Sequence, residues 1–500
     1  MNRTYRKIVR NRKNRIARRL KACFWPEQPC PMFAGRNIHY EMADKVQAVS
    51  CGGLGAIHLM ACKIGLVDAI NAMVTVLQRH LPYHESDHVL NLAYNILAGG
   101  VRLEDLELRR QDEAYLNGLG AQRIPDPTTA GDFTRRFRPA DILALLEAIN
   151  AARQNVWRLQ PEGFLEEAVI DVDGSLAPTL GECKAGMDIS YKGSWGYHPL
   201  IISLAKTKEV LYLVNRSGNV PSHDGFVPWL DRAIALVRPY ARSIFVRGDT
   251  DFSHTAHFDR WTDEGVRFVF GMDASPALVK LAESLCEASW RGLGRTAREI
   301  QTAPRERPEN VKERIVQERE FVNQRLESEQ VTEVEYRPGK CQRAYRLVIV
   351  RKNLSVEKGE DFLFPEVRYF FYVTNRLDLV WHEVVQQAHE RCNQENVIAQ
   401  LKGGVNALRL PVRDLVSNWA YMVMATLAWN LKAWFGLLMP DRAAGERVVK
   451  MEFRTFLNTL VHLPAQIMHT GRKIVYRVLS YNSWLKDFFA TWEYLRVLQV

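Results

Sequence analysis

The sequence predicts an α/β fold in which a mixed-sheet core is interrupted by a β-rich insertion and flanked by helical regions at both ends. Two apolar runs, EEAVIDVDGS at residues 166–175 and SIFVRGDTDF at residues 243–252, have the composition of buried strands. Between them, GFVPWLDRAIALVRPY at residues 225–240 has the periodicity of an amphipathic helix. Strands that alternate with crossover helices are typical of an α/β sheet.

The first 21 residues form a strongly basic arm. Ten lysines and arginines occur there without an acidic residue, and Arg10, Lys13, Arg18 and Arg19 are among them. This run and the formal net charge of +10 favour a polyanionic partner, although anionic lipid would satisfy the charge as well as nucleic acid. The arm is therefore either a tether for DNA phosphates or a solvated, frayed extension.

Residues 1–155 are predicted to comprise this arm and a helical DNA-binding region. GAIHLMACKIGLVDAINAMVTVLQRHL and DHVLNLAYNILAGGV have apolar residues at helical spacing, and Gly99-Gly100 supplies a stop. PDPTTAGDFTRRF predicts a turn after which Thr129 caps a short basic helix. This pattern is shared by helix-turn-helix readers of DNA and by ordinary helical bundles.

The rest of the chain divides by composition into four parts. The core is expected at residues 156–284 and 376–437, on either side of a β-rich insertion at residues 285–375 that contains VTEVEY, RAYRLVIVR and RYFFYVT. Residues 438–500 are predicted to be a helical C-terminal region that includes the basic segment HTGRKIVYRVL.

Three features predict a soluble, cytoplasmic protein. The most apolar stretch, WAYMVMATLAWNLKAWFGLLM, is interrupted by Asn430 and Lys432, which favours a buried amphipathic helix over a membrane span. The eight cysteines are scattered without a C-x-x-C pair, which favours a reducing compartment and argues against structural zinc. No apolar core of a signal peptide follows the basic arm.

Acidic residues, Asp173 and Asp249, come at the ends of both core strands. If these strands are neighbours, the carboxylates converge, and hard oxygen ligands held close together bind Mg²⁺ or Mn²⁺. Glu395 is the natural third carboxylate, and helical geometry places Arg391 and Lys402 within about 40° of it. Two such ions would support phosphodiester displacement. Alternatively, the strand-end acids cap turns and the helical trio is a solvated salt-bridge ladder.

Several stretches occur in an order known from one family. They are TTAGDFTRRF, IDVDGSLAPTLG, YKGSWGYHPL, NRSGNVPSHDG and VRGDTDF, followed by the spacing of Arg391, Glu395 and Lys402. In these stretches the chain resembles the DDE transposases of bacterial insertion sequences, and more narrowly the group known as transposase DDE group 1. Its Tyr-x2-Arg-x3-Glu-x6-Lys signature is matched except at the tyrosine, where this chain has Ala388.

The resemblance implies a retroviral-integrase-like RNase H fold and a role for each acid. Asp173 lies in a D-x-T-like motif with serine in place of threonine, Asp249 ends the later strand, and Glu395 lies in the signature. These three would be catalytic and would hold two Mg²⁺ or Mn²⁺ ions. Asp171 and Asp251 lie close by in sequence and are alternative ligands.

The resemblance also implies contacts with DNA. Arg391 and Lys402 would hold DNA phosphates or balance the acidic cluster, and Lys192 in YKGSWGYHPL could line the DNA groove near Asp173 or lie in an edge strand. Trp290 is the candidate for stacking on an unpaired base, although a lone tryptophan is more often part of a core.

The sequence therefore predicts a DNA transposase that binds terminal inverted repeats, cleaves a strand and transfers the freed 3′-hydroxyl to a second phosphodiester. Its expected partners are double-stranded DNA, at the element ends and at the target, and a second copy of the chain in a synaptic homodimer. We expect it in the bacterial cytoplasm, associated with the nucleoid. The alternatives are an RNase H-like structure-specific nuclease, and a catalytically inactive DNA-binding relic or domesticated regulator, which Ala388 makes conceivable.

Overall fold

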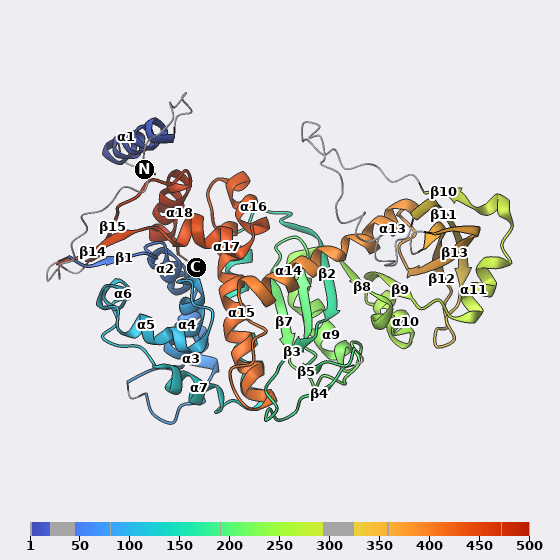
Figure 1. Cartoon of the computed structure of the whole chain (residues 1–500), viewed down its shortest axis with the longest axis horizontal. Coiled ribbons are helices and arrows are strands. Elements are labelled where there is room, and N and C mark those ends of the chain that lie inside the picture. Colours follow the sequence, from blue (N-terminus) through green and yellow to red (C-terminus); the bar gives the residue numbers. More distant parts are fainter. Residues whose placement is uncertain are drawn as a thin grey trace.

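The computed structural model describes residues 3–20, 46–80, 82–190, 192–293, 325–357, 360–471 and 473–499. A helical region formed by both ends of the chain lies beside a large sheet, and the predicted insertion lies at the far end of that sheet (Figure 1).

Nine strands form the central sheet, in the order β10-β11-β12-β13-β9-β8-β2-β6-β7. Its core strands are β2 (Leu165–Gly174), β6 (Leu200–Leu204), β7 (Val210–Val214), β8 (Ala241–Gly248) and β9 (Val266–Met272). β2 runs parallel to β8 and antiparallel to β6, so the sheet is mixed. The predicted α/β fold is confirmed, and the expected crossover helix is α9 (Phe226–Val237).

The strands of the predicted insertion continue the same sheet. They are β10 (Arg291–Gly292), β11 (Arg325–Tyr336), β12 (Tyr345–Glu357) and β13 (Glu360–Thr374). β13 pairs antiparallel with β9 from Phe371 to Thr374. The three strands expected in this region are present, and the limits of the insertion as a domain remain a prediction.

Helices dominate the N-terminal part. After α1 (Arg3–Leu20) they are α2 (Leu54–Lys63), α3 (Leu66–Met73), α4 (Glu85–Leu97), α5 (Leu106–Arg110), α6 (Glu113–Leu119), α7 (Pro127–Thr134) and α8 (Pro139–Arg158). Thr129 does not open its helix as predicted, because α7 begins at Pro127 and Asp126 caps it by accepting a hydrogen bond from the Thr129 N–H at 2.8 Å. Proline at the first helical position makes this earlier start favourable.

The long apolar helix is α15 (Leu415–Leu437), and it packs against α4, α8 and β7. All its residues from Ser417 to Gly436 are buried, so the predicted buried helix is confirmed. The two polar interruptions are satisfied internally: Asn430 accepts from the Val210 N–H, and the Lys432 ammonium donates to the Val449 carbonyl. In the described ranges no single helix has the length and apolarity to cross a membrane, whereas the bent pair α2 and α3 has them only when taken together.

The prediction of helix in HTGRKIVYRVL is wrong. This segment lies in a β-hairpin of β14 (Ala465–Thr470) and β15 (Lys473–Val478), and β14 also pairs with β1 (Ala48–Val49). Gly471 has φ +58°, a left-handed conformation that suits a tight turn, and the β-branched residues after it favour a strand.

The remaining helices and strands complete the described chain. They are β3 (Ala177–Pro178), β4 (Asp188–Ile189), β5 (Trp195–Tyr197), α10 (Phe258–Asp263), α11 (Pro276–Glu283), α13 (Trp381–Glu390), α14 (Cys392–Ala399), α16 (Arg442–Lys450), α17 (Phe453–Phe456) and α18 (Leu485–Val497).

A buried carboxylate connects the helical region to the sheet. Glu209, just before β7, accepts hydrogen bonds from Arg153 Nε at 2.9 Å, Trp157 Nε1 at 3.0 Å and Trp434 Nε1 at 2.6 Å. Arg153 and Glu209 are both completely buried. These contacts join α8, the start of β7 and α15, and thereby fix the helices relative to the core sheet.

We expect Arg153→Met to destabilise the protein by about 3–5 kcal/mol, because the Glu209 carboxylate would stay buried without its cation. The measurement is the shift of the denaturant unfolding midpoint. Arg158→Met is the matched control, since Arg158 is exposed on the same helix and should have little effect. Equal midpoints for the two variants would contradict a structural role for the pair.

Candidate active site

Two neighbouring strand ends place the two aspartates at one edge of the sheet. In the parallel pairing of β2 with β8, Asp171 lies opposite Arg247. Asp173 and Asp249 each come two residues later: Asp173 is still paired with Ile201 of β6, whereas Asp249 directly follows the end of β8, so both lie at the same edge of the sheet. Asp249 is also the N-cap of a short 3-10 turn, where its Oδ1 accepts from the Asp251 N–H at 3.1 Å.

One guanidinium contacts all three predicted catalytic acids. Arg391 Nη1 donates to Asp173 Oδ2 at 2.9 Å, while Nη2 lies 3.9 Å from Asp249 Oδ2 and 3.7 Å from Glu395 Oε1. The acids come from β2, from the end of β8 and from α14. The structure therefore brings together the three residues that were predicted from distant parts of the sequence.

The electrostatics of the two aspartates explain why a cation lies between them. Burial raises the pKa of Asp173 to about 6, Arg391 opposes that rise, and the nearby charge of Asp249 adds to it. Burial also raises the pKa of Asp249, again against the effect of Arg391. Although burial works in the other direction, attraction to both aspartates raises the pKa of Arg391. The guanidinium thus stabilises carboxylates whose ionised forms are disfavoured by burial.

The three carboxylates are suitable ligands for a divalent ion, but they are not arranged as a complete coordination site. Its oxygens are the hard ligands that Mg²⁺ and Mn²⁺ prefer, and Glu395 is 60% exposed and accessible. Within the residues that the structure describes, no group of three or more His, Cys, Asp or Glu side chains is arranged to hold a metal ion. The acids meet at Arg391 rather than at one another, so their roles as metal ligands remain predictions that the donor chemistry fits.

Arg247 gives Asp171 a structural role. Its Nε and Nη2 donate to the two Asp171 carboxylate oxygens at 2.7 and 3.0 Å, and both side chains are almost completely buried. Arg247 Nη1 also reaches the Gln387 carbonyl at 3.3 Å and the Glu390 carboxylate at 3.4 Å on α13. Asp171 is therefore a poor alternative ligand, whereas Asp251 is exposed and remains one.

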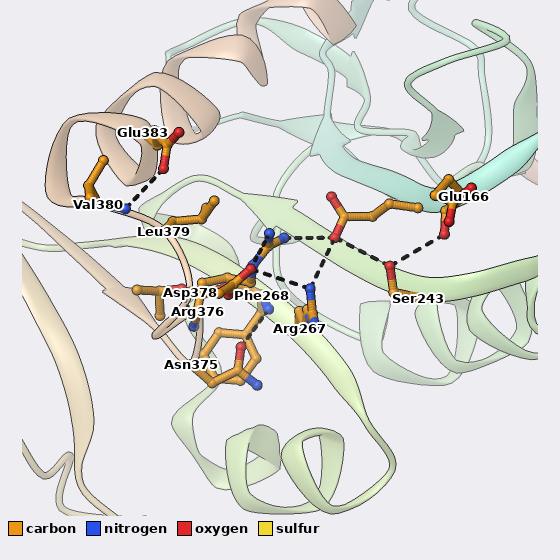
Figure 2. Close-up of polar contacts among 12 residues, drawn as sticks. Glu166, Ser243, Arg267, Phe268, Asn375, Arg376, Asp378, Leu379, Val380 and Glu383 are labelled. Atoms are coloured by element: carbon orange, nitrogen blue, oxygen red, sulfur yellow. Dashed lines mark hydrogen bonds and ion pairs between the residues drawn. The ribbon is translucent and has the colours of Figure 1, made fainter.

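The helix that leads to the site is also fixed at its beginning (Figure 2). Arg376 donates to Glu167 on β2 at 2.7 Å and to both Asp378 oxygens at 2.8 and 2.9 Å. Glu383 then accepts from the N-cap N–H of α13 at 3.0 Å. The strand that carries Asp173 thus also holds the segment leading into the helix, which limits how far that helix can shift.

The predicted single helix is in fact interrupted at both functional positions. Arg391 is the junction between α13 and α14, and Lys402 lies in a short π-helical turn, Gln400–Gly404. The pKa of Lys402 is lowered by burial and further by the charge of Lys192, while Asp173 raises it. Lys402 therefore lies near Asp173 and near Lys192, while the role of either lysine in DNA binding remains a prediction.

Two other candidates have different surroundings. Trp290 is 8% exposed, and the Arg351 guanidinium lies over its ring at 4.4 Å. This arrangement favours core packing over base stacking, which would require Arg351 to move. Ala388, at the position of the family tyrosine, packs against the apolar cluster that contains Val384 and Val385.

The arm residues lie far from the acids. Arg10, Lys13 and Arg18 are exposed on α1, next to the C-terminal hairpin; Arg19 also belongs to this helix, but its side chain lies outside the described residues (Figure 1). The alternative of a frayed arm is therefore wrong for residues 3–20.

Sequence reasoning missed two residues that position the site. Arg247 is one, and its signal was a charged residue inside an apolar strand, in the same register as Asp171. Gln394 is the other: its Nε2 donates to the Asp171 carbonyl at 3.1 Å and to the Ile201 carbonyl at 3.0 Å. Gln394 precedes Glu395 and fixes α14 to β2 and β6, but nothing in its local sequence distinguishes it from an exposed glutamine.

One comparison with known proteins agrees with these findings. A family model described as Transposase DDE domain group 1 matches residues 33–500. No curated protein matches. Among solved structures, the chain is similar to a piggyBac transposase synaptic complex with hairpin DNA, with a TM-score of 0.37 and 12% identity over 84% of this chain and 83% of that one. A likeness at that level carries no argument about this chain.

Replacing Arg391 with alanine tests its role between the acids. With a chelator present, we expect the variant to melt at a lower temperature than the parent, because three carboxylates lose their shared cation. Added Mn²⁺ should raise its melting temperature by more than it raises the parent's, since the ion no longer competes with the guanidinium. Arg391→Lys keeps the positive charge but lacks the planar guanidinium. Its rise in melting temperature with Mn²⁺ should lie between those of the parent and Arg391→Ala. Equal Mn²⁺ responses in all three proteins would contradict this competition.

Proposed function

The chain belongs to the transposase DDE domain group 1 family and is a DNA transposase, and from that premise we propose that Asp173, Asp249 and Glu395 are its catalytic carboxylates. The observation that supports this assignment is the contact of all three with the single guanidinium of Arg391. Acids from two strands and a helix have no structural need to share one cation, whereas a site for phosphoryl chemistry needs them close together.

Family membership implies dependence on a divalent metal. The ions are proposed to be two Mg²⁺ or Mn²⁺, held by Asp173, Asp249 and Glu395; when bound, they supply activation of a water or 3′-hydroxyl and stabilisation of the leaving oxygen. Asp251 is the alternative ligand, because it is exposed beside Asp249.

The other side chains at the site either bind the DNA or hold the site in position. The charge of the carboxylates would be neutralised by bound divalent ions. The Arg391 guanidinium would then be free to bind a DNA phosphate through two of its coplanar N–H donors. Lys402 lies near Asp173 and Lys192 lies near Lys402, and both add positive charge for the strand that enters the site. Arg247 and Gln394 position β2, β8 and the two helices, so that the acids and the guanidinium stay in register.

The proposed reaction is that of an insertion-sequence transposase. The helical N-terminal region and the basic residues Arg10, Lys13, Arg18 and Arg19 bind the terminal inverted repeats. The site then cleaves a strand and joins the freed 3′-hydroxyl to target DNA. A homodimer holding two paired ends is the proposed assembly, in the bacterial cytoplasm at the nucleoid.

A catalytically inactive DNA-binding protein is the second candidate, because Ala388 packs into an apolar cluster where relatives are expected to have tyrosine. Such a protein would keep its DNA affinity but would lack cleavage with any divalent ion.

The test compares the parent with Asp249→Ala and the matched control Asp251→Ala on a duplex carrying the inverted repeats that flank this coding sequence. We expect Asp249→Ala to lose cleavage and strand transfer by more than about a hundredfold, beyond the loss typical of changes around a metal site, while DNA binding persists. Asp251→Ala should retain most activity.

Each other outcome contradicts part of the proposal. Cleavage retained by Asp249→Ala excludes Asp249 as a ligand. Cleavage by the parent without any joined product identifies a nuclease. Binding by the parent without cleavage in either Mg²⁺ or Mn²⁺ identifies an inactive protein.

A further inference from the structure

The positive charge of this protein is concentrated in one helix. Among its 18 residues α1 has nine lysines and arginines and no acidic residue, whereas the formal net charge of the whole chain is +10. The rest of the molecule is therefore close to neutral, and attraction to a polyanion must act largely through the surface to which this helix belongs.

One side of α1 fixes the helix to the C-terminal part of the chain. The Tyr5 ring stacks on Phe489 of α18 with centroids 5.8 Å apart. Val9 packs against the main core, and Arg12 Nη1 donates to the carbonyls of Val478 and Ser480 at 2.9 and 3.1 Å. Since these residues are four and three positions apart, they lie on one stripe of the helix.

The opposite side of α1 is a basic row that faces solvent. Helical geometry places Arg3, Lys7, Arg10, Asn14 and Arg18 opposite the stripe of Tyr5, Val9 and Arg12, and all five are exposed. The row spans roughly 22 Å at 1.5 Å per residue, which corresponds to about six phosphates of one DNA strand at 3.4 Å each. Arg12 is thus a positioning residue, and the row itself is available to a partner.

The β14–β15 hairpin lies beside α1 and has an outward face of its own (Figure 1). Tyr476 points inward, so close to Gly55 and Gly118 that a Cβ at either glycine would come within 2.6 and 2.7 Å of its side chain. Because side chains alternate along a strand, Lys473 and Arg477 lie on the opposite, outward face, where both are exposed. Arg477 Nη1 lies 3.3 Å from Gln466 Oε1 on the paired strand.

We propose that α1 and the β14–β15 hairpin form one composite surface that binds the backbone of duplex DNA, built from both ends of the chain. The inference rests on the proposed function and extends it, because it assigns DNA binding to a C-terminal hairpin and fixes the orientation of the arm. The observations that carry it are the attachment of α1 to the hairpin through Arg12 and the outward position of the cations on both elements.

A duplex is the polyanion that fits this surface. A helical row of cations matches the extended, regular charge of DNA. The neighbouring hairpin extends beyond the two residues of β14 that pair with β1, so its end is a two-stranded ribbon, which is narrow enough to follow a groove. No acidic residue interrupts the row on α1. The contacts are to phosphates, so binding here does not depend on base sequence.

The experiment measures duplex affinity of the full-length protein between about 50 and 200 mM salt, with a chelator to prevent cleavage. Each lost phosphate contact lowers the slope of log K against log salt by about 0.9. We expect Lys473→Ala/Arg477→Ala to lower the slope by about 2 and Arg3→Ala/Lys7→Ala/Arg10→Ala by about 3. Lys280→Ala/Arg343→Ala is the matched control, since it removes two exposed cations from α11 and from the connection between β11 and β12, and these elements lie at the other end of the molecule from α1 (Figure 1); the slope should be unchanged.

The proposal would be overturned if Lys473→Ala/Arg477→Ala had the same slope of log K against log salt as the parent. Lys473→Gln/Arg477→Gln, which retains polar side chains, should show the same loss with an unchanged melting temperature, and a lower melting temperature together with a parental slope would also overturn it. A parent protein that binds duplex DNA without salt dependence would instead overturn the proposed function, so the two failures are distinguishable.

Discussion

The structure of the site depends on one interaction, the contact of the Arg391 guanidinium with three carboxylates. Asp173, Asp249 and Glu395 would repel one another if they were brought together alone, and burial makes this repulsion stronger for the two aspartates. A guanidinium offers five donors in a plane, so it can contact acids that approach from separate elements. The cation therefore explains how the sheet edge and the helix can share one point before any divalent ion is bound.

A second ion pair makes the first one possible. Asp171 and Arg247 form a buried bidentate pair across β2 and β8, two residues before Asp173 and Asp249, the proposed catalytic aspartates, and Arg247 also reaches α13. This pair fixes the register of the strands and the position of the helix that ends at Arg391. The site thus has two layers of arginine–carboxylate contacts: the buried pair of Asp171 and Arg247, and the more exposed contacts of Arg391 with the three acids. Charge can change in the outer group during catalysis while the inner pair keeps the geometry constant.

Much of the core followed from local pattern in the sequence. Apolar strands that end in acids, and the apolar helix α15, depend on short-range periodicity, so their positions could be predicted. The contact between Arg391 and Asp173 could not, because it depends on a strand register between residues 218 positions apart. The sequence suggests Asp171 as an alternative metal ligand, because its structural role depends on its contact with Arg247 on the neighbouring strand, which local sequence does not reveal. The segment HTGRKIVYRVL forms part of a hairpin rather than the predicted helix, because its strands are stabilised by pairing between β14 and β15 and a single segment does not reveal that pairing.

The most direct test of the central claim is the position of Mn²⁺ in a crystal structure of this protein, located by anomalous scattering. We expect Mn²⁺ to bind between the carboxylates of Asp173 and Asp249 within reach of Glu395, with Arg391 displaced from the Asp173 oxygen that it contacts at 2.9 Å. Mn²⁺ bound elsewhere in the molecule, with Arg391 still paired to Asp173, would contradict it.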